Sequence, residues 1–593
     1  MKIITKLLFL LALAATFFVS CKKDKEETPT PTNSTAISAP ISGTVVDVYG
    51  NALVSVTVKA GTYTTTTDQF GAFYIPSVTF STSRFSVSFE KTGYFSLHRS
   101  GIPQSGKPIN LSVGLISETD YTYAGQISYT STQADSITLP NGSIISFPAN
   151  AFVKSDGSAF SGNVTVKACY LDPSWDDYGM FVFGGDLYGK DINNTDVMLN
   201  PFAGLNVVIT DNSGNKLVLD SVHNKKATVK MLIPPAMQSI APNNISLWEY
   251  NTNLCMASEK GSAVKYGDKY QGEVAHFSYW SCQKSFIGKA TIYGYVKKLV
   301  GSDSVSVSGM KVRVGRQIVI TDQDGRYEAK VPAGVDNIVV VPVFAGVAFN
   351  PYIFSTGLQD NQSYRVDFSI PSGNTVLLRG TVRSADGALL PNVCVSAEWY
   401  STSQQKVITF TNNLGKFVLP VDATANYVTL IAKTATNSVT KYINYPTDTT
   451  NADMVMPATP GANKLTVNGS VIFNITGMPD GASISSYCSV PYMDIYVHVP
   501  NNGTFTIMSA NASLPPMVNQ TYAIPSDFKI QFGTQQMTDP DTLINGTIKF
   551  TKFNAVQGKL MEGVFSGTGS LGATVSGIFS VPYSSAKKKV NAK

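Results

Sequence analysis

The chain has 593 residues, of which only 14% are charged, and its formal net charge is +5. This length exceeds what one hydrophobic core can serve and predicts about four or five domains, while the small net charge argues against a nucleic-acid partner. The cysteines and histidines are scattered, with no CxxC pair and no His-x-x-Glu pair, which argues against zinc, redox and zinc-peptidase sites. We therefore expect no metal site and no cofactor.

The N-terminus has the pattern of an export signal. A basic head precedes an apolar run from Leu7 to Ser20, which is too short to span a bilayer comfortably. The box Phe18-Val19-Ser20-Cys21 resembles the lipobox of bacterial lipoproteins, in which the cysteine carries the lipid, although Phe18 stands where Leu is usual. The alternative is a plain signal peptide that ends near a cysteine. We expect a signal at residues 1–20 and membrane attachment through a lipid on Cys21.

Residues 21–38 predict an extended tether between the lipid and the first domain. Threonine and proline alternate at residues 28–32, a composition that stays extended and solvated. The charged residues Lys22 to Glu27 resemble the short signal that sends some Gram-negative lipoproteins to the outside of the outer membrane. The alternative is an ordinary charged linker. We expect an outer-membrane protein that is exposed on the cell surface, and attachment to the periplasmic side of that membrane is the alternative.

Three later stretches share one pattern. Each begins with Gly-x-Val, alternates apolar and polar residues with the period of a half-buried strand, and contains Thr-[Asp/Asn]-x-x-Gly-x-[Phe/Tyr]. Glycine and Asp or Asn suit a tight turn, so Gly71, Gly325 and Gly415 should occupy equivalent turn positions. Asp322 and Asp324 also look like the start of a calcium loop, but the glutamate that would end it is missing, and a turn explains them.

The three copies resemble the carboxypeptidase regulatory-like domain, a small transthyretin-like β-sandwich. The resemblance implies three such sandwiches, at residues 39–117, 287–372 and 373–460. No peptidase domain accompanies them, so the resemblance implies a fold and not a catalytic activity.

A different β-rich domain is expected at residues 118–286. Its opening and closing segments resemble a region of animal extracellular proteins such as cartilage intermediate layer protein and of many bacterial lipoproteins, which implies no chemistry. One loop combines Trp175 and Tyr178 with Asp176 and Asp177. Flat aromatic rings and carboxylates are typical of sugar sites, whereas Ca²⁺ needs six to eight oxygens. These four residues are the candidate ligand-binding site of the chain, while an ordinary surface turn is the favoured interpretation of the loop.

The cysteines that remain after lipidation of Cys21 are odd in number. Cys394 lies between the inward-facing Val393 and Val395, so alternation directs it outward. A disulfide bridge between Cys255 and Cys282 is one alternative. Buried free thiols are the expectation, because free cysteine is a common core residue.

The last domain is expected at residues 461–584. Short alternating strands joined by glycine-rich turns favour an antiparallel sandwich or barrel. Residues 585–593 form a basic tail.

The predicted fold class is all-β, a multi-domain chain of antiparallel β-sandwiches of transthyretin-like or Ig-like type on an N-terminal lipid tether. The expected function is non-catalytic binding or adhesion at the cell surface, with a glycan or an envelope protein as partner. The alternative is a structural or accessory subunit of an envelope uptake or secretion complex. A hydrolase comes third, because two catalytic carboxylates need not be close in sequence. We assign no catalytic residue.

Overall fold

The computed structural model describes residues 36–583, apart from short gaps at residues 81–82, 345, 372, 386, 402–403, 458–461, 477–482, 490–491, 501, 511–515, 535–538 and 554–557. The predicted signal, Cys21 and the basic tail lie outside this range. Nearly all regular structure in the described residues is strand, and the helical turns found there are α2 (Tyr178–Phe181) and η1 (Pro235–Met237). Within the described residues, no helix has the length and apolar character needed to cross a membrane. The predicted all-β, multi-domain fold is confirmed.

The first sandwich packs two sheets over one core. Its sheets have the strand orders β4-β1-β7 and β3-β2-β5-β6. The alternation read from the sequence buries Val58, Val87 and Phe89 between them. Its strands are β1 (Ile37–Val46), β2 (Thr57–Ala60), β3 (Tyr63–Thr66), β4 (Ala72–Phe80), β5 (Phe85–Glu90), β6 (Leu97–Gly101) and β7 (Ile109–Gly114).

The second and third sandwiches repeat this plan. In each of the three, the first strand is antiparallel to the strand after the turn and parallel to the last strands, and four other strands form the opposite sheet. The second contains β21 (Lys289–Val300), β22 (Asp303–Ser306), β23 (Lys311–Val314), β24 (Gln317–Ile320), β25 (Arg326–Pro332), β26 (Ile338–Val343), β27 (Tyr352–Phe354), β28 (Ser363–Arg365) and β29 (Phe368–Ser369). The third contains β30 (Thr375–Arg383), β31 (Cys394–Tyr400), β32 (Gln404–Phe410), β33 (Lys416–Asp422), β34 (Tyr427–Lys433), β35 (Ser438–Asn444) and β36 (Met454–Val455).

The repeated turn has the same construction in all three sandwiches. Gly71, Gly325 and Gly415 have φ angles of 68°, 76° and 66°, the left-handed region that glycine adopts without strain. In each turn, the Asp or Asn three residues earlier accepts backbone hydrogen bonds with its side-chain oxygen. The preceding threonine hydroxyl donates to a backbone carbonyl at 2.5–2.8 Å. The predicted equivalence of the three turns is confirmed, and the aspartates at 322 and 324 belong to a turn.

The glycine that opens each repeat is needed for a different reason, which is the close approach of another segment. A Cβ at Gly380 would lie 2.5 Å from the carbonyl carbon of Ala452, and one at Gly43 would lie 3.0 Å from that of Leu111. One at Gly294 would lie 2.6 Å from the carbonyl carbon of Val366. These glycines therefore let the last segment of each sandwich approach its first strand.

The middle domain is built on one large, curled sheet. Its strand order is β8-β12-β14-β20-β17-β18-β19-β16-β10-β9, with β13 paired to β14 and β18. The aromatic residues of its closing segment, Trp248, Tyr279 and Trp280, are buried. Its strands are β8 (Ala124–Thr130), β9 (Asp135–Thr138), β10 (Ile144–Phe147), β11 (Phe152–Lys154), β12 (Asn163–Leu171), β13 (Tyr188–Lys190), β14 (Asp196–Asp211), β15 (Leu217–Leu219), β16 (Ala227–Leu232), β17 (Asn244–Asn251), β18 (Met256–Tyr266), β19 (Lys269–Val274) and β20 (Tyr279–Phe286).

The C-terminal domain also folds one sheet over a single core. The order is β38-β37-β46-β45-β44-β43-β41-β40-β39, with β42 paired to β44. Ser486 on β39 donates a hydrogen bond of 2.6 Å to the carbonyl of Pro582 on β46, which brings distant strands of the sheet together. Its strands are β37 (Ala462–Val467), β38 (Ser470–Thr476), β39 (Ser483–Ser489), β40 (Tyr492–Val499), β41 (Gly503–Ser509), β42 (Thr521–Ile524), β43 (Phe528–Thr534), β44 (Asp541–Lys552), β45 (Leu560–Gly569) and β46 (Thr574–Pro582).

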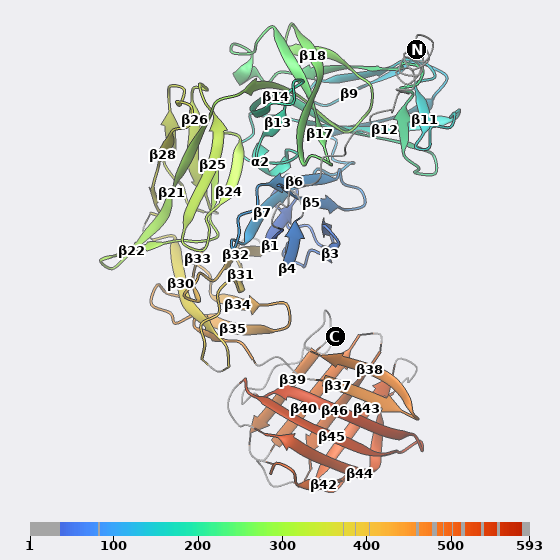
Figure 1. The fold of residues 1–593 in the computed structure, drawn as a ribbon, viewed down its shortest axis with the longest axis vertical. Helices are drawn as coiled ribbons and strands as arrows, with labels where there is room; N and C mark the ends of the chain where they lie inside the picture. Colours follow the sequence, from blue (N-terminus) through green and yellow to red (C-terminus); the bar gives the residue numbers. More distant parts are fainter. Residues whose placement is uncertain are drawn as a thin grey trace, which may run out of the picture.

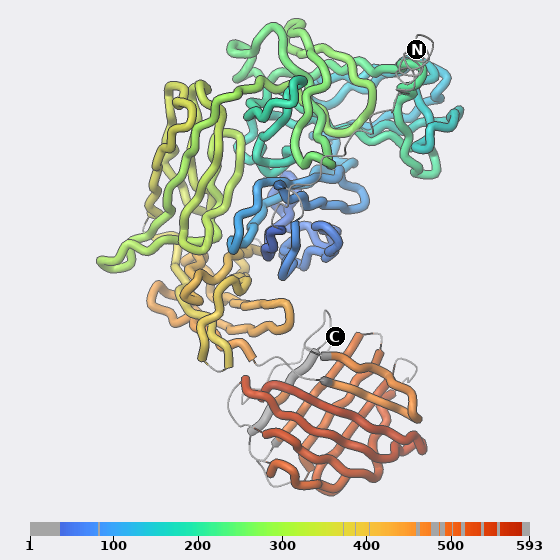
Figure 2. The backbone as a smooth tube through the Cα atoms, in the orientation of Figure 1, coloured from blue at the N-terminus to red at the C-terminus, as the bar shows by residue number. Residues whose placement is uncertain are grey.

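The three sandwiches and the middle domain close into a ring of contacts, and the C-terminal domain follows the third sandwich (Figures 1 and 2). Each of the four junctions contains an ion pair with a mostly buried cation. Removing one partner of such a pair is costly, because it leaves a desolvated charge without compensation. The pairs are Arg84–Asp186 between the first sandwich and the middle domain, Arg313–Asp176 between the second sandwich and the middle domain, Lys298–Asp448 between the second and third sandwiches, and Lys406–Asp68 between the third and first.

Candidate ligand-binding cleft

The aromatic residues of the predicted ligand-binding loop belong to a core between domains. Tyr178 is fully buried at the start of α2, and its hydroxyl oxygen lies 3.3 Å from that of Tyr279. Trp175 packs against the rings of Tyr123 and Tyr170, with centroids 5.4 and 5.6 Å away. The candidate ligand-binding role is thereby corrected for Tyr178, whose ring reaches no surface, while neighbouring rings contact Trp175.

The two aspartates of the same loop face the second sandwich. The carboxylate of Asp176 pairs with the guanidinium of Arg313. Burial raises the pKa of the Asp177 carboxyl. The helical turn α2 packs closely against β24. A Cβ added at Gly179 would lie only 2.5 Å from the backbone nitrogen of Ile318, so this position has room for glycine alone. This loop therefore joins two domains, which gives its mixture of rings and carboxylates a structural explanation.

Titratable side chains do not gather into a metal site in the part of the chain that the structure describes. No group of three or more His, Cys, Asp or Glu residues is placed there to hold an ion. His276 pairs with Glu249, and His223 pairs with Asp220 at 2.6 Å.

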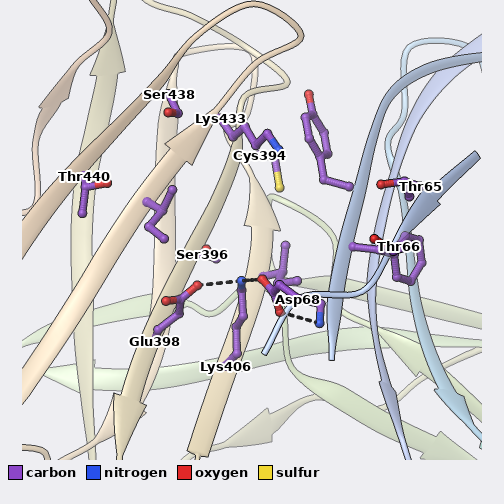
Figure 3. A pocket seen from close by; sticks show the side chains of 15 residues that line it. Thr65, Thr66, Asp68, Cys394, Ser396, Glu398, Lys406, Lys433, Ser438 and Thr440 are labelled. Atoms are coloured by element: carbon purple, nitrogen blue, oxygen red, sulfur yellow. Dashed lines mark hydrogen bonds and ion pairs between the residues drawn. The ribbon is translucent and has the colours of Figure 1, made fainter. Parts of the chain in front are cut away.

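A cleft of about 380 Å³ opens between the first and third sandwiches (Figure 3). Its volume is within the range of roughly 300–1,000 Å³ that is usual for small-ligand sites. One wall comes from β3, β4 and the repeated turn between them, and the other is the outer face of the sheet β32-β31-β34-β35. The polar side chains that line it are those of Thr65, Thr66, Asp68, Ser396, Glu398, Lys406, Lys433, Ser438 and Thr440.

Lys406 is the central charge of this cleft. Its ammonium lies 2.8 Å from a carboxylate oxygen of Asp68 and 2.6 Å from one of Glu398, as the dashed lines in Figure 3 mark. Burial opposes the charge on Lys406, but these two carboxylates outweigh it and raise the pKa of the lysine. Lys406 therefore stays cationic and ties the two sandwiches together across the cleft.

The local structure explains why these three charges meet. Glu398 on β31 stands opposite Lys406 on β32. Both point away from the core, because Ala397 and Trp399 beside Glu398 and Val407 beside Lys406 pack into it. Asp68 is the aspartate of the repeated turn in the first sandwich, and one carboxylate oxygen is already occupied by the backbone of that turn. Sequence reasoning did not single out Glu398 or Lys406.

Further contacts hold the two walls in place. The side-chain amide of Asn110 donates a hydrogen bond of 2.8 Å to the carbonyl of Ile408. The rings of Tyr74 and Phe410 lie 6.3 Å apart, and Cys394 is buried beside them. The outward direction predicted for Cys394 is right with respect to its own sandwich, but the first sandwich covers it.

The reactivity of the cysteine thiols tests whether these side chains are buried. Cys169, Cys255, Cys282 and Cys394 are free and buried, which confirms the preference for free thiols over a bridge from Cys255 to Cys282. Burial raises the pKa of the Cys394 thiol to about 12. Because the thiolate is the reactive form, we expect Cys394 to react with a disulfide reagent at pH 8 at least about a hundredfold more slowly than a free thiol, and to react fully in denaturant. Labelling followed by peptide mass spectrometry measures this, and rapid native labelling of Cys394 would contradict its burial.

Comparisons with known proteins show likeness in structure alone. No family model matches the chain, and no curated protein matches it. A catechol 1,2-dioxygenase from Acinetobacter sp. ADP1 is 16% identical over 14% of this chain and 44% of its own, with a TM-score of 0.11. The shaft pilin SpaA from Lactobacillus rhamnosus GG is 10% identical over 28% of this chain and 96% of its own, with a TM-score of 0.14. The Bacillus anthracis TIE protein is 9% identical over 72% of this chain and 66% of its own, also with a TM-score of 0.14.

The chain thus spans less than half the length of the dioxygenase. At these low scores and identities the likenesses carry no argument about the site or its ligand. The cleft between the first and third sandwiches is the feature of the structure that bears on function.

Proposed function

We propose that this protein is a non-catalytic binding protein of the bacterial cell surface, built from carboxypeptidase regulatory-like sandwiches and held in the outer membrane by a lipid on Cys21. Its partner is a glycan or another component of the envelope. The observation that carries the proposal is the cleft between the first and third sandwiches, whose two walls are held together by Lys406. Binding at a surface needs a concave site with a few fixed polar groups, and this cleft supplies them.

The same cleft contains two carboxylates, so a hydrolase has to be weighed against a binding protein. A hydrolase with paired carboxylates directs both of them at the substrate, with one as an acid and the other as a base or nucleophile. Here the ammonium of Lys406 contacts both Asp68 and Glu398, and the turn of the first sandwich occupies the other oxygen of Asp68. This arrangement favours a fixed binding surface over acid–base chemistry.

Co-sedimentation with insoluble material tests the proposal. We expect the purified protein to sediment with isolated cell envelopes or with an insoluble polysaccharide, and to release no soluble sugar from either. Thr440 is exposed on the third sandwich and lines the cleft, so Thr440→Arg should reduce sedimentation about tenfold by obstructing the cleft. Thr449→Arg is the matched control, because Thr449 is exposed on the same sandwich and does not line the cleft.

Two results would contradict the proposal. Release of soluble products that stops in an Asp68→Asn or Glu398→Gln variant would make the protein a hydrolase. Sedimentation that Thr440→Arg leaves unchanged would place binding on another surface.

The lipid anchor has its own test, since Cys21 lies outside the described residues. Only the cysteine thiol can form the thioether to the lipid, so Cys21→Ser should leave the protein unprocessed or release it from the outer membrane. Fractionation of membranes, with detection of the lipid by mass spectrometry, measures this. A Cys21→Ser protein that still partitions wholly with the outer membrane would rule out lipid attachment.

A further inference from the structure

The outer face of the sheet β32-β31-β34-β35 continues beyond the cleft. In the strand register, Cys394 lies opposite Lys433, Ser396 opposite Ile431, and Glu398 opposite Thr429. One step further along β31 and β34 come Tyr400 and Tyr427, with Tyr442 on β35 opposite Thr429. Because side chains two apart share a face, this face runs without interruption from the cleft to a group of tyrosines.

These tyrosines form an exposed aromatic platform. The rings of Tyr427 and Tyr442 are stacked, with centroids 5.8 Å apart and planes inclined by 20°. Tyr427 is 46% exposed, Tyr442 is 61% exposed and the neighbouring Tyr400 is 69% exposed. Exposed aromatic side chains that gather beside a cleft are a feature of interaction surfaces. Tyrosine supplies broad contact area at a small cost in side-chain entropy, which is why it is common in binding surfaces.

The cleft beside the platform selects for an uncharged, hydroxyl-rich ligand. Its charged side chains are the cations Lys406 and Lys433 and the carboxylates Asp68 and Glu398, so their formal charges cancel. The hydroxyls of Ser438 and Thr440 are exposed on the same wall, and each can donate and accept hydrogen bonds. A ligand with many hydroxyls and no net charge satisfies such groups without leaving one of the buried ions uncompensated.

We propose that this face is the binding site for a neutral glycan chain, with one sugar ring on Tyr427 and Tyr442 and the next units in the cleft beside Thr440 and Glu398. The C–H face of a pyranose is apolar and fits an aromatic ring, while its hydroxyls fit the polar cleft. The seven residues from Tyr427 to Lys433 extend over about 20 Å at the usual rise of a strand, which suits an oligosaccharide better than a single sugar. This inference rests on the proposed function and names the ligand class and the residues of that site.

Affinity electrophoresis of the purified protein in gels that contain xylan, galactomannan, mixed-linkage β-glucan or dextran tests the proposal, with alginate as an anionic comparison. We expect at least one neutral polysaccharide to retard the protein. Tyr427→Ala and Tyr442→Ala should each weaken that retardation about tenfold, as the loss of an anchoring side chain does, while Tyr427→Phe and Tyr442→Phe should keep most of it because the ring remains. Tyr266→Ala is the control, since Tyr266 is 77% exposed on β18 of the middle domain.

Three outcomes would overturn this inference. They are retardation by none of the neutral polysaccharides, retardation by alginate alone, and retardation that neither alanine variant changes. Co-sedimentation with cell envelopes separates this failure from failure of the proposed function. If sedimentation persists and still depends on Thr440, the protein binds an envelope component and only the neutral-glycan assignment falls.

Discussion

Replacing Gly294 with alanine is expected to open the second sandwich. Gly294 lies in β21, and a Cβ there would lie 2.6 Å from the carbonyl carbon of Val366 and closer still to its oxygen. That carbonyl also accepts a hydrogen bond of 2.6 Å from the hydroxyl of the buried Tyr327, so it cannot move away freely. We expect the variant to lose about 3 kcal/mol of stability in this sandwich, at the upper end of the usual cost of overpacking.

Hydrogen exchange resolved by peptide mass spectrometry measures this loss where it occurs, because a chain of several domains is not expected to unfold in a single transition. The control is Gly261→Ala in β18, where an added Cβ meets no heavy atom within 4 Å. That change should be neutral or should stabilise the strand by about 0.5–1 kcal/mol, because alanine loses less backbone freedom than glycine. If exchange in β21 and β25 were the same in the Gly294→Ala variant as in the wild type, the close approach of the two segments would be wrong.

Replacing Arg99 with leucine is expected to separate the first sandwich from the middle domain. Arg99 is 4% exposed, and its guanidinium donates hydrogen bonds to the carbonyls of Gly179, Val182 and Ser112 at 2.7, 3.2 and 3.3 Å. Leucine leaves these buried acceptors without a donor and Asp186 without one of its cationic neighbours. The expected cost is about 3–5 kcal/mol, as for other buried charges that lose their partner.

Exchange of the amides in β6, β7 and α2 should therefore accelerate by a factor of about 150 to 5,000. The matched control is Lys59→Leu, which removes an ion pair to Glu90 at the surface of the same sandwich, where both side chains are about half exposed. An exposed pair of this kind contributes about 1 kcal/mol or less. Equal effects from the two variants would mean that Arg99 does not hold the junction.

Local chemistry made much of the fold predictable. A period of two and the Thr-[Asp/Asn]-x-x-Gly turn depend on neighbours within a few residues, so three sandwiches with equivalent glycines could be expected before the structure. The all-β class followed from the same signals. The close approach of two backbones that requires glycine at position 294 could not be predicted from the sequence. Gly294 and Val366 are far apart in the chain, with several strands of the sandwich between them.

The site was much less predictable, because it depends on how whole domains meet. Asp68 and Lys406 are 338 positions apart, and no pattern in either segment refers to the other. Alternation directed Cys394 out of its own sandwich correctly but could not say that another sandwich covers it. The same limit affected the loop with Trp175 and Tyr178, which looked like a sugar site although its rings pack between domains and its Asp176 pairs with Arg313 of the second sandwich. The available signal was the cross-strand pair of Glu398 and Lys406, which requires the register of two strands.

A structure determined with a bound oligosaccharide tests the central claim most directly. The oligosaccharide should come from the polysaccharide that retards the protein most strongly. Our account predicts an intact chain with one ring against Tyr427 and Tyr442 and further units beside Thr440 and Glu398. A chain bound on another domain, or one found cleaved between Asp68 and Glu398, would contradict it.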